Sequence, residues 1–218
     1  MDLASYIEHT LLSADCTSAD IERICKEARE FGFSAVCIPP YYVKHAANFL
    51  ADSPTRVCTV IGFPLGYSTI AAKVEEIKRA LNDEADELDV VVNVTAVKNG
   101  DWSYVKSEID SVTRAVHLKG KVIKLIFETA LLTDEEIKRL CQICEEVDLD
   151  YVKTSTGYHN PGATTQSVDL LKKNLPDKIR IKASGGIRTR AAAEDLIQAG
   201  ASRLGSSAGI MIVGEKEQ

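Results

Sequence analysis

Three charged residues of this 218-residue sequence lie within short runs of β-branched and apolar residues, which are typical of strands. Asp89 stands in Glu-Leu-Asp-Val-Val-Val-Asn, Lys153 in Tyr-Val-Lys-Thr-Ser-Thr-Gly and Lys182 in Ile-Lys-Ala-Ser-Gly-Gly-Ile. A lysine buried beside another cation loses part of its preference for the charged form, so its pKa falls. A neutral amine is the nucleophile that Schiff-base chemistry requires. A nearby carboxylate can move the protons needed to form and dehydrate a carbinolamine.

The spacing of the two lysines supports this interpretation. Lys153 and Lys182 are 29 residues apart, the length of one strand-helix repeat in this chain, so we expect them at equivalent depth on neighbouring strands. In the alternative, each lysine lies at a strand end with its stem buried and its ammonium in water. The repeat spacing, with an acid on a third strand, favours catalysis. Lys124 is a third inward lysine, with a supporting role in pairing with Asp89 or in tuning the site.

A second group of candidate residues consists of glycines and serines after the last two predicted strands. In parallel barrels, the loops after strands seven and eight and the N-terminus of an extra helix form the usual phosphate site. Glycine lets the backbone N–H groups approach phosphate oxygens, and serine hydroxyls donate further hydrogen bonds. Each glycine run alone could equally mark a tight turn. Together they predict a phosphate site formed by Gly157, Gly185, Gly186, Gly205, Ser206 and Ser207.

Other residue types form no recognisable site. Cys141 and Cys144 form a Cys-x-x-Cys pair, but no second pair and no histidine cluster accompanies them. The four histidines are scattered along the chain, so no metal triad is predicted. Cys37 is expected to line the interior as a small supporting residue, which is a commoner role for a buried cysteine than that of nucleophile. We therefore expect neither a metal nor a cofactor.

Strand and helix patterns alternate along the whole chain. Each β-branched run is followed by a polar turn and a helical stretch. The predicted strands cover residues 7–10, 34–38, 56–61, 87–94, 121–128, 150–155, 178–184 and 202–205. The predicted helices cover residues 18–31, 42–50, 70–82, 102–117, 134–147, 165–174 and 191–199.

This alternation predicts a parallel sheet with right-handed crossovers, either open and doubly wound or closed into a barrel. Several strands carry polar residues at alternate positions, such as Lys124 and Glu128, which point to one face. Strands buried on both faces in a parallel sheet are normally apolar throughout, so the polar face suggests a barrel interior that opens into an active site. We predict one α/β domain over residues 1–218, a (β/α)8 TIM barrel with a short N-terminal helical segment.

Composition excludes several classes of protein. Hydrophobic residues make up 45% and charged residues 27%, which excludes disordered and collagen-like chains. The net charge of −6 argues against a nucleic-acid binder, and the lack of a long apolar run argues against a membrane span. The first residues lack the pattern of a signal peptide, and the six cysteines are interpreted as reduced thiols, so we expect a cytoplasmic location.

Several segments of the chain resemble the deoxyribose-phosphate aldolase family of class I aldolases. The resemblance runs from about Ile7 to Val213 and is most specific in combination at the two lysine segments. These segments are Lys153-Thr154-Ser155-Thr156-Gly157 and Lys182-Ala183-Ser184-Gly185-Gly186-Ile187-Arg188. Two departures stand out. Glu8 occupies a position where the family commonly has aspartate, and the loop over residues 158–162 is less glycine-rich than usual.

The resemblance implies that Lys153 forms the Schiff base and that Asp89 and Lys182 act in proton transfer. It also implies cleavage of 2-deoxy-D-ribose 5-phosphate to acetaldehyde and glyceraldehyde 3-phosphate without a metal. The expected partners are thus sugar-phosphate and aldehyde substrates, with no nucleic acid and no membrane. Barrels this small often pair, so we expect a homodimer or a homotetramer. A transaldolase-like enzyme and a non-catalytic sugar-phosphate-binding barrel are the alternatives.

Overall fold

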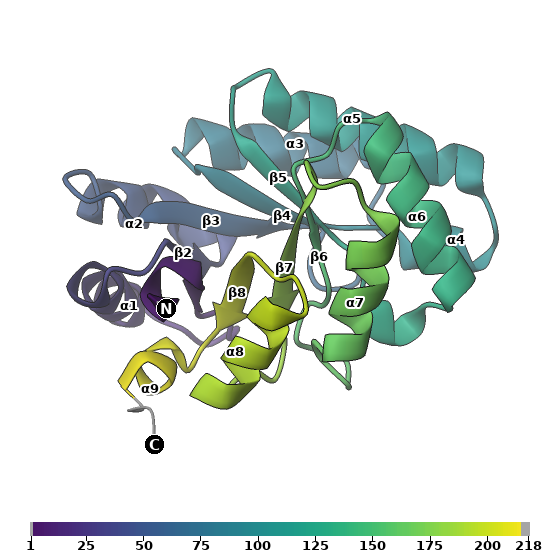
Figure 1. Ribbon diagram of the computed structural model, residues 1–218. Helices are drawn as coiled ribbons and strands as arrows, with labels where there is room; N and C mark the ends of the chain where they lie inside the picture. Colours follow the sequence, from purple (N-terminus) through teal and green to yellow (C-terminus); the bar gives the residue numbers. More distant parts are fainter. Residues whose placement is uncertain (1, 215–218) are drawn as a thin grey trace.

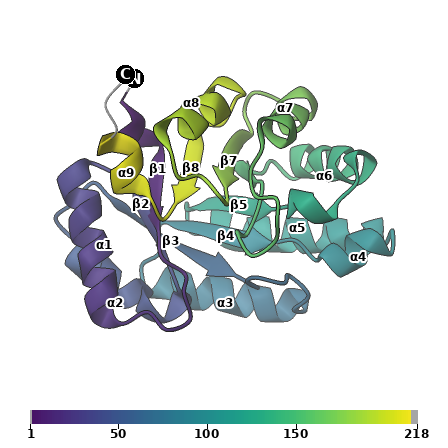
Figure 2. The ribbon, with the colours of Figure 1, turned by 90° about the horizontal axis from the view of Figure 1, so that it is seen from below.

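The computed structural model describes residues 2–214, and the domain predicted over residues 1–218 extends beyond both ends of that range. Its centre is a closed barrel of parallel strands in chain order, which confirms the predicted TIM barrel (Figures 1 and 2). The strands are β1 (Ile7–Thr10), β2 (Ala35–Ile38), β3 (Arg56–Ile61), β4 (Glu87–Val91), β5 (Val122–Ile126), β6 (Tyr151–Lys153), β7 (Arg180–Ser184) and β8 (Arg203–Ser206). Pairing of β1 with β8 closes the barrel, so the predicted strand at residues 7–10 completes it.

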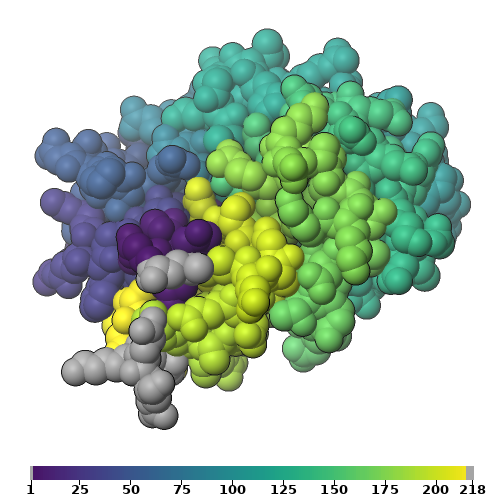
Figure 3. Space-filling view, viewed as in Figure 1, coloured from purple at the N-terminus to yellow at the C-terminus, as the bar shows by residue number. Residues whose placement is uncertain are grey.

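Helices surround this barrel on its outer face (Figure 1). The α-helices are α1 (Ser18–Phe31), α2 (Val43–Phe49), α3 (Ile70–Asn82), α4 (Val94–Lys98), α5 (Trp102–His117), α6 (Asp134–Glu146), α7 (Thr165–Asn174), α8 (Arg190–Gln198) and α9 (Gly209–Gly214). The 3-10 helices are η1 (Leu3–Tyr6), η2 (Pro40–Tyr42) and η3 (Thr129–Leu131). Helix η1 is the predicted N-terminal helical segment, and it contacts α9, so the first and last described helices lie side by side (Figure 3).

Several predicted strands are longer than the observed ones, and the one predicted over residues 87–94 runs into a helix. Residues 92–94 were expected to continue β4, but the strand ends at Val91 and helix α4 begins at Val94. Asn93 starts this helix, because its side-chain Oδ1 accepts a hydrogen bond from the backbone N–H of Ala96 at 3.0 Å. The β propensity of the valine run masked this cap.

The apolar core lies between the strands and the helices, while the barrel interior is largely polar. Outward residues such as Val36, Leu88 and Val152 are completely buried against the helices. Inward residues alternate with them, as the two-residue period of a strand requires. Cys37, Cys58 and Val60 form a small apolar cluster on the inner face, and charged side chains fill much of the remaining interior. None of the helices within residues 2–214 has the length and apolar character that a bilayer span requires.

A buried ion pair outside the barrel fixes the end of β4. Lys73 on α3 and Glu108 on α5 are joined at 2.7 Å, and both side chains are almost completely buried. Lys73 Nζ also donates to the carbonyl of Val91 at 2.6 Å, and Glu108 accepts from the backbone N–H of Asn93 at 2.9 Å. The pair therefore binds two helices to the strand that carries Asp89.

Candidate active site

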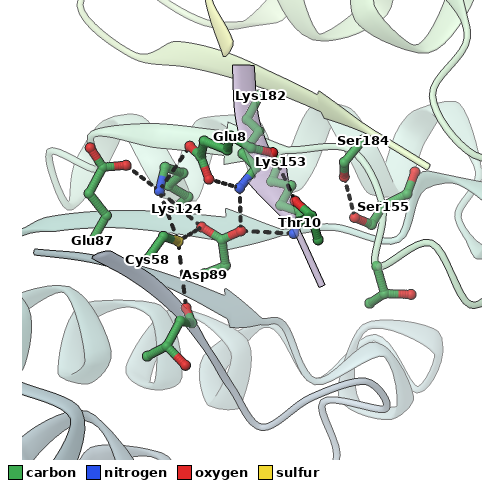
Figure 4. Close-up of polar contacts among 12 residues, drawn as sticks. Glu8, Thr10, Cys58, Glu87, Asp89, Lys124, Lys153, Ser155, Lys182 and Ser184 are labelled. Carbon is green, nitrogen blue, oxygen red and sulfur yellow. Dashed lines mark hydrogen bonds and ion pairs between the residues drawn. The ribbon is translucent and has the colours of Figure 1, made fainter. Parts of the chain in front are cut away.

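The structure brings Asp89, Lys153 and Lys182 into direct contact inside the barrel (Figure 4). Asp89 Oδ2 accepts a hydrogen bond from Lys153 Nζ at 2.8 Å and another from Lys182 Nζ at 2.7 Å. The three residues come from β4, β6 and β7, and each is at most 2% exposed. Lys153 and Lys182 are register partners on neighbouring strands, the position that their spacing predicts. The arrangement therefore holds an amine, a carboxylate and a second amine within proton-transfer distance.

Below this group, a network of ion pairs fills the barrel toward the N-terminal ends of the strands (Figure 4). Lys182 pairs with Glu8 as well as with Asp89. Lys124 Nζ lies 3.3 Å from Glu8 Oε1, 2.5 Å from Glu87 Oε2 and 3.1 Å from Asp89 Oδ1. Arg203 Nη1 completes the network at 3.1 Å from Glu8 Oε1 and 3.4 Å from Glu87 Oε2. Lys124 thus pairs with Asp89, one of the two roles considered for it.

The network fixes the protonation of Asp89, which contacts Lys153, and of Lys182, which contacts the same carboxylate. Burial opposes ionisation of Asp89, but the charges of Lys124, Lys153 and Lys182 outweigh it and hold the pKa of Asp89 well below its ordinary value. Burial likewise opposes the charged form of Lys182, yet Asp89 and Glu8 raise the pKa of Lys182 above that of an ordinary lysine. In the resting site, Asp89 is therefore a carboxylate that can accept a proton, and Lys182 is an ammonium that can donate one.

The same balance governs the lower part of the network. Burial raises the pKa of Glu87, but Lys124 and Arg203 lower it to about 2. Burial opposes the charge of Lys124, while Asp89, Glu8 and Glu87 raise its pKa well above the ordinary value. These residues remain charged at neutral pH, because each has opposite charges within hydrogen-bond distance.

Two cysteines border the network on its β2–β3 side. Cys37 and Cys58 are register partners, and Cys58 Sγ lies 3.3 Å from Asp89 Oδ1 and 3.4 Å from Lys124 Nζ. A hydrogen bond from Cys58 and the charge of Lys182 lower the pKa of Cys37 against the effect of burial, whereas burial raises that of Cys58 well above its ordinary value. Cys37 therefore lines the interior as expected, beside the catalytic candidates.

Four potential metal ligands meet in this interior. Within residues 2–214, the ligand atoms of Glu8, Cys37, Cys58 and Asp89 all lie within 4.8 Å of one another. Both carboxylates already accept from lysine ammonium groups, and Lys182 Nζ contacts both of them. A cation placed there would meet the positive charges of these lysines at close range. The donor set is thus built for lysines rather than for a metal.

A cavity opens above Lys153 at the C-terminal ends of the strands. Its volume is about 410 Å³, and Lys153 lines it whereas Asp89 and Lys182 lie beneath. The six residues predicted to bind phosphate all line the same cavity: Gly157, Gly185, Gly186, Gly205, Ser206 and Ser207. Thr10, Tyr158 and the exposed Arg188 line it as well. The structure therefore places an anion-compatible loop cluster and the candidate nucleophile around one space.

Two of the six residues have structural tasks within this cluster. A Cβ on Gly205 would lie 3.1 Å from Lys182 Cε and 3.0 Å from Ser184 Cβ, so the absent side chain makes room for the lysine stem. The hydroxyl of Ser206 donates to the carbonyl of Ile187 at 2.7 Å and accepts from the N–H of Ala208 at 3.0 Å. Ser207 is exposed and lines the cavity.

Sequence reasoning missed several members of the site. Glu87 lies two residues before Asp89, so the two-residue period of a strand already placed both on one face. Glu8 and Thr10 are related in the same way on β1. Arg203 and Cys58 carried no comparable signal, because their partners lie far away in the sequence. Arg188 belongs to the segment after β7 and was not singled out as a cavity residue.

Comparison with known proteins places the chain in a family. The family model described as DeoC/LacD family aldolase matches residues 3–213. A protein from Thermoanaerobacter sp. (strain X514) named deoxyribose-phosphate aldolase is 47% identical over 216 residues, covering 99% of this chain and 97% of its own length. A protein of the same name from Staphylococcus carnosus (strain TM300) is 46% identical over 213 residues, with coverage of 98% and 96%.

A solved structure shows the same fold. The deoxyribose phosphate aldolase from Aeropyrum pernix superposes with a TM-score of 0.91 at 31% identity, covering 97% of this chain and 89% of that chain. The family match and the near-complete coverage of the relatives span every strand that contributes to the site. The chain belongs to the DeoC/LacD family of aldolases.

Proposed function

We propose that this protein reversibly cleaves 2-deoxy-D-ribose 5-phosphate to acetaldehyde and D-glyceraldehyde 3-phosphate through a Schiff base on Lys153. One observation carries the proposal: Lys153 Nζ is bonded to Asp89 and lines a cavity whose other walls are the glycine and serine loops. The relatives at 47% and 46% identity that are named deoxyribose-phosphate aldolase support the choice of substrate.

The charge balance of the interior supports a nucleophilic lysine. Inside the barrel, three carboxylates form ion pairs with four buried cationic groups: Glu8, Glu87 and Asp89 with Lys124, Lys153, Lys182 and Arg203. The half-exposed Arg56 adds a further positive charge on Glu87 at 2.6 Å. Lys153 has a single carboxylate partner among its contacts, whereas Lys124 contacts three and Lys182 two. Lys153 is therefore the amine of the network with the fewest carboxylates around it.

Substrate orientation follows from the cavity walls. The phosphate group binds the loops after β7 and β8, where backbone N–H groups, Ser207 and Arg188 surround the space. The carbon chain then extends toward Lys153 at the base, with C1 of the open-chain aldehyde at the amine. Few positively charged side chains are needed at this end of the cavity, because the phosphate is bound mainly by backbone N–H and hydroxyl groups.

The first half of the reaction forms the covalent intermediate. The uncharged amine of Lys153 attacks C1, and the carbonyl oxygen takes up a proton to give a carbinolamine. Lys182 donates and Asp89 accepts in these transfers, in line with the resting protonation that their contacts favour. The carbinolamine then loses water and becomes an iminium ion.

The second half breaks the carbon chain. The C3 hydroxyl loses its proton to a base, the C2–C3 electron pair moves toward the iminium nitrogen, and glyceraldehyde 3-phosphate leaves. The remaining enamine takes a proton at C2, and water hydrolyses the iminium to release acetaldehyde and free Lys153. The iminium nitrogen is the electron sink in this scheme, so the cycle needs no metal. We assign the enzyme to deoxyribose phosphate catabolism, in a compartment where its six free cysteines stay reduced.

Borohydride trapping tests the proposal directly. The protein is incubated with acetaldehyde and sodium borohydride, and the modified peptide is mapped by mass spectrometry. We expect reduction to a stable ethyl-lysine at Lys153, no trapping in Lys153→Ala, and normal trapping in Lys106→Ala, which removes a half-exposed lysine on α5. An adduct on Lys153→Ala would disprove the assignment. Faster turnover of fructose 6-phosphate than of deoxyribose 5-phosphate would favour the transaldolase-like alternative.

We also propose a homo-oligomer. The Aeropyrum pernix protein, 31% identical to this chain, is described as having a unique tetrameric structure. Light scattering coupled to size-exclusion chromatography measures the mass directly. A monomeric mass at micromolar concentration would contradict this proposal without affecting the chemistry.

A further inference from the structure

The side chain of Tyr158 separates the substrate cavity from a second cavity. Tyr158 and Leu12 line the space above Lys153. A neighbouring cavity of about 280 Å³ shares Leu12 and is also lined by Phe63, whose ring packs against that of Tyr158. The two centroids are 5.4 Å apart and the rings are nearly perpendicular, at 85°. Tyr158 and Phe63 therefore stand as a wall between the two spaces.

Few contacts hold this wall in place. The hydroxyl of Tyr158 donates to the carbonyl of Leu12 at 3.1 Å, which links the loop after β6 to the loop after β1. The backbone N–H of Tyr158 donates to Thr156 Oγ1 at 3.1 Å, and the carboxylate of the buried Glu128 accepts from the N–H of Thr156 at 3.2 Å. Tyr158 as a whole is 57% exposed. The loop backbone is thus held by Thr156 and Glu128, while the position of the Tyr158 ring is set by its contacts with Leu12 and Phe63.

The second cavity is lined by both apolar side chains and polar groups. The apolar side chains include Leu12, Pro39, Val60, Phe63 and Leu65. Among its described lining residues Glu76 carries the single charge, and its carboxylate already accepts from the N–H of Gly62 at 2.7 Å. A hydrocarbon chain that contacts the apolar side chains of this cavity would leave water for an apolar surface, and the hydrogen bond between Glu76 and Gly62 would be kept.

We propose that Tyr158 is a specificity-determining residue that closes a latent subsite for the hydrocarbon chain of an acceptor aldehyde. The inference rests on the proposed function and concerns its reverse, carbon–carbon bond-forming direction. There the acetaldehyde enamine on Lys153 forms a bond from its C2 to the acceptor carbonyl carbon, and the carbonyl oxygen takes up a proton. Water then hydrolyses the iminium and releases a 3-hydroxyaldehyde. With the ring of Tyr158 present, the acceptor chain is confined to the phosphate side of the cavity.

Removing the ring joins the two cavities and changes the preference among acceptors. Each methylene buried in an apolar space contributes roughly a fourfold preference. Hexanal has three more methylenes than propanal. We therefore expect the kcat/KM ratio of hexanal to propanal to rise by about tenfold or more in Tyr158→Ala, since part of the chain enters the second cavity.

Matched variants separate this effect from general loosening of the loop. Tyr158→Phe removes the hydrogen bond to Leu12 but keeps the ring, so its ratio should stay within about twofold of the original, far below one fully buried methylene. Ser68 lines the second cavity and does not belong to the lining of the first. Adding Ser68→Phe to Tyr158→Ala fills the new space and should return the ratio toward its original value. Tyr158→Leu is a second opening variant, with a smaller expected rise.

The measurement is the initial rate of aldol addition with acetaldehyde as donor, alongside borohydride trapping of each variant. An unchanged ratio in both Tyr158→Ala and Tyr158→Leu, with trapping intact, overturns the proposal. An equal rise in Tyr158→Phe, or no reversal by Ser68→Phe, overturns it as well. If the unmodified protein itself traps no acetaldehyde at Lys153, the proposed function fails instead, so the two failures are distinguishable.

Discussion

A single oxygen atom, Oδ2 of Asp89, accepts hydrogen bonds from both Lys153 at 2.8 Å and Lys182 at 2.7 Å. A change in the protonation of one amine therefore changes the electrostatic environment of the other, because both are hydrogen-bonded to the same carboxylate oxygen. Because β4 carries this carboxylate and the Lys73–Glu108 pair fixes the end of β4, the contact is held by the barrel and by two helices. This relationship and the contacts around it lead to five predictions.

Removing the charge of Asp89 should stop proton transfer while sparing the nucleophile. We expect Asp89→Asn to lower kcat by about 10²- to 10⁴-fold, the range typical of a lost general acid or base. Steady-state cleavage of deoxyribose 5-phosphate measures this. Asp110→Asn is the control, because Asp110 pairs with Arg114 on the outer face of α5. A loss below tenfold in Asp89→Asn would contradict the assigned role.

Lys182→Met should separate proton transfer from imine formation. The variant retains Lys153, so acetaldehyde should still be trapped at that residue, but more slowly and with a changed pH–rate profile. The physical reason is that Lys182 contributes the second positive charge on Asp89 Oδ2. A pH–rate profile identical to that of the unmodified protein would show that the two amines are not coupled.

Gly205→Ala should affect Lys182 rather than only the phosphate. The new Cβ would lie 3.1 Å from Lys182 Cε, so the lysine stem must shift. We expect kcat to fall about tenfold or more, since small displacements of reacting groups are costly. The loss should persist with unphosphorylated deoxyribose as substrate. Gly214→Ala is the control, because an added Cβ there meets no atom within 4 Å. A loss confined to the phosphorylated substrate would assign Gly205 to phosphate binding alone.

The stability of the protein should fall in acid because of Glu87. Its folded-state pKa of about 2 lies below the ordinary glutamate value, so its stabilising effect is present above about pH 5 and disappears as the pH falls toward 2. We expect that part to be on the order of 3 kcal/mol. Urea unfolding between pH 7 and pH 3 measures it, with Glu87→Gln expected to flatten the curve. Glu75→Gln, which changes a side chain 76% exposed, should not.

Replacing one partner of the Lys73–Glu108 pair should lower the free energy of unfolding more than replacing both partners. Lys73→Met leaves a buried carboxylate without its counter-charge, at a cost of about 3–5 kcal/mol. Lys73→Met combined with Glu108→Gln removes both charges and leaves the amide oxygen to accept from Asn93, so part of the loss should be recovered. A double-mutant cycle from urea unfolding tests this. Strict additivity of the two single losses would show that the pair is not coupled.

The barrel could be predicted from the sequence because its signals are local. Alternating strand and helix patterns gave the element order, and residues 7–10 form β1 with the bounds expected for them. Helix α4 was missed, because a valine run favours a strand and the cap at Asn93 acts through a single side chain. The alternation of polar residues such as Lys124 and Glu128 indicated a polar barrel interior, but it did not show how far the charged network extends along the barrel.

The sequence predicts which site residues lie on neighbouring strands, because these follow the repeat period of the chain. The 29-residue spacing places Lys153 beside Lys182, and the structure pairs them on neighbouring strands. Contacts across the barrel have no such period. Glu8 and Arg203 are 195 residues apart in the chain, and their contact depends on barrel closure by β1 and β8. The wall formed by Tyr158 likewise depends on three loops meeting in space.

The buried ion network also constrains how this sequence can evolve. Glu8 contacts Lys124, Lys182 and Arg203, so any single replacement that removes its carboxylate leaves three cations short of a partner. Substitutions at these positions should therefore be accepted during evolution only when they conserve the charge or when a partner changes at the same time. The outward positions of the strands need only apolar volume and can drift one at a time. Among related sequences we therefore expect correlated substitutions inside the barrel and independent ones beneath the helices.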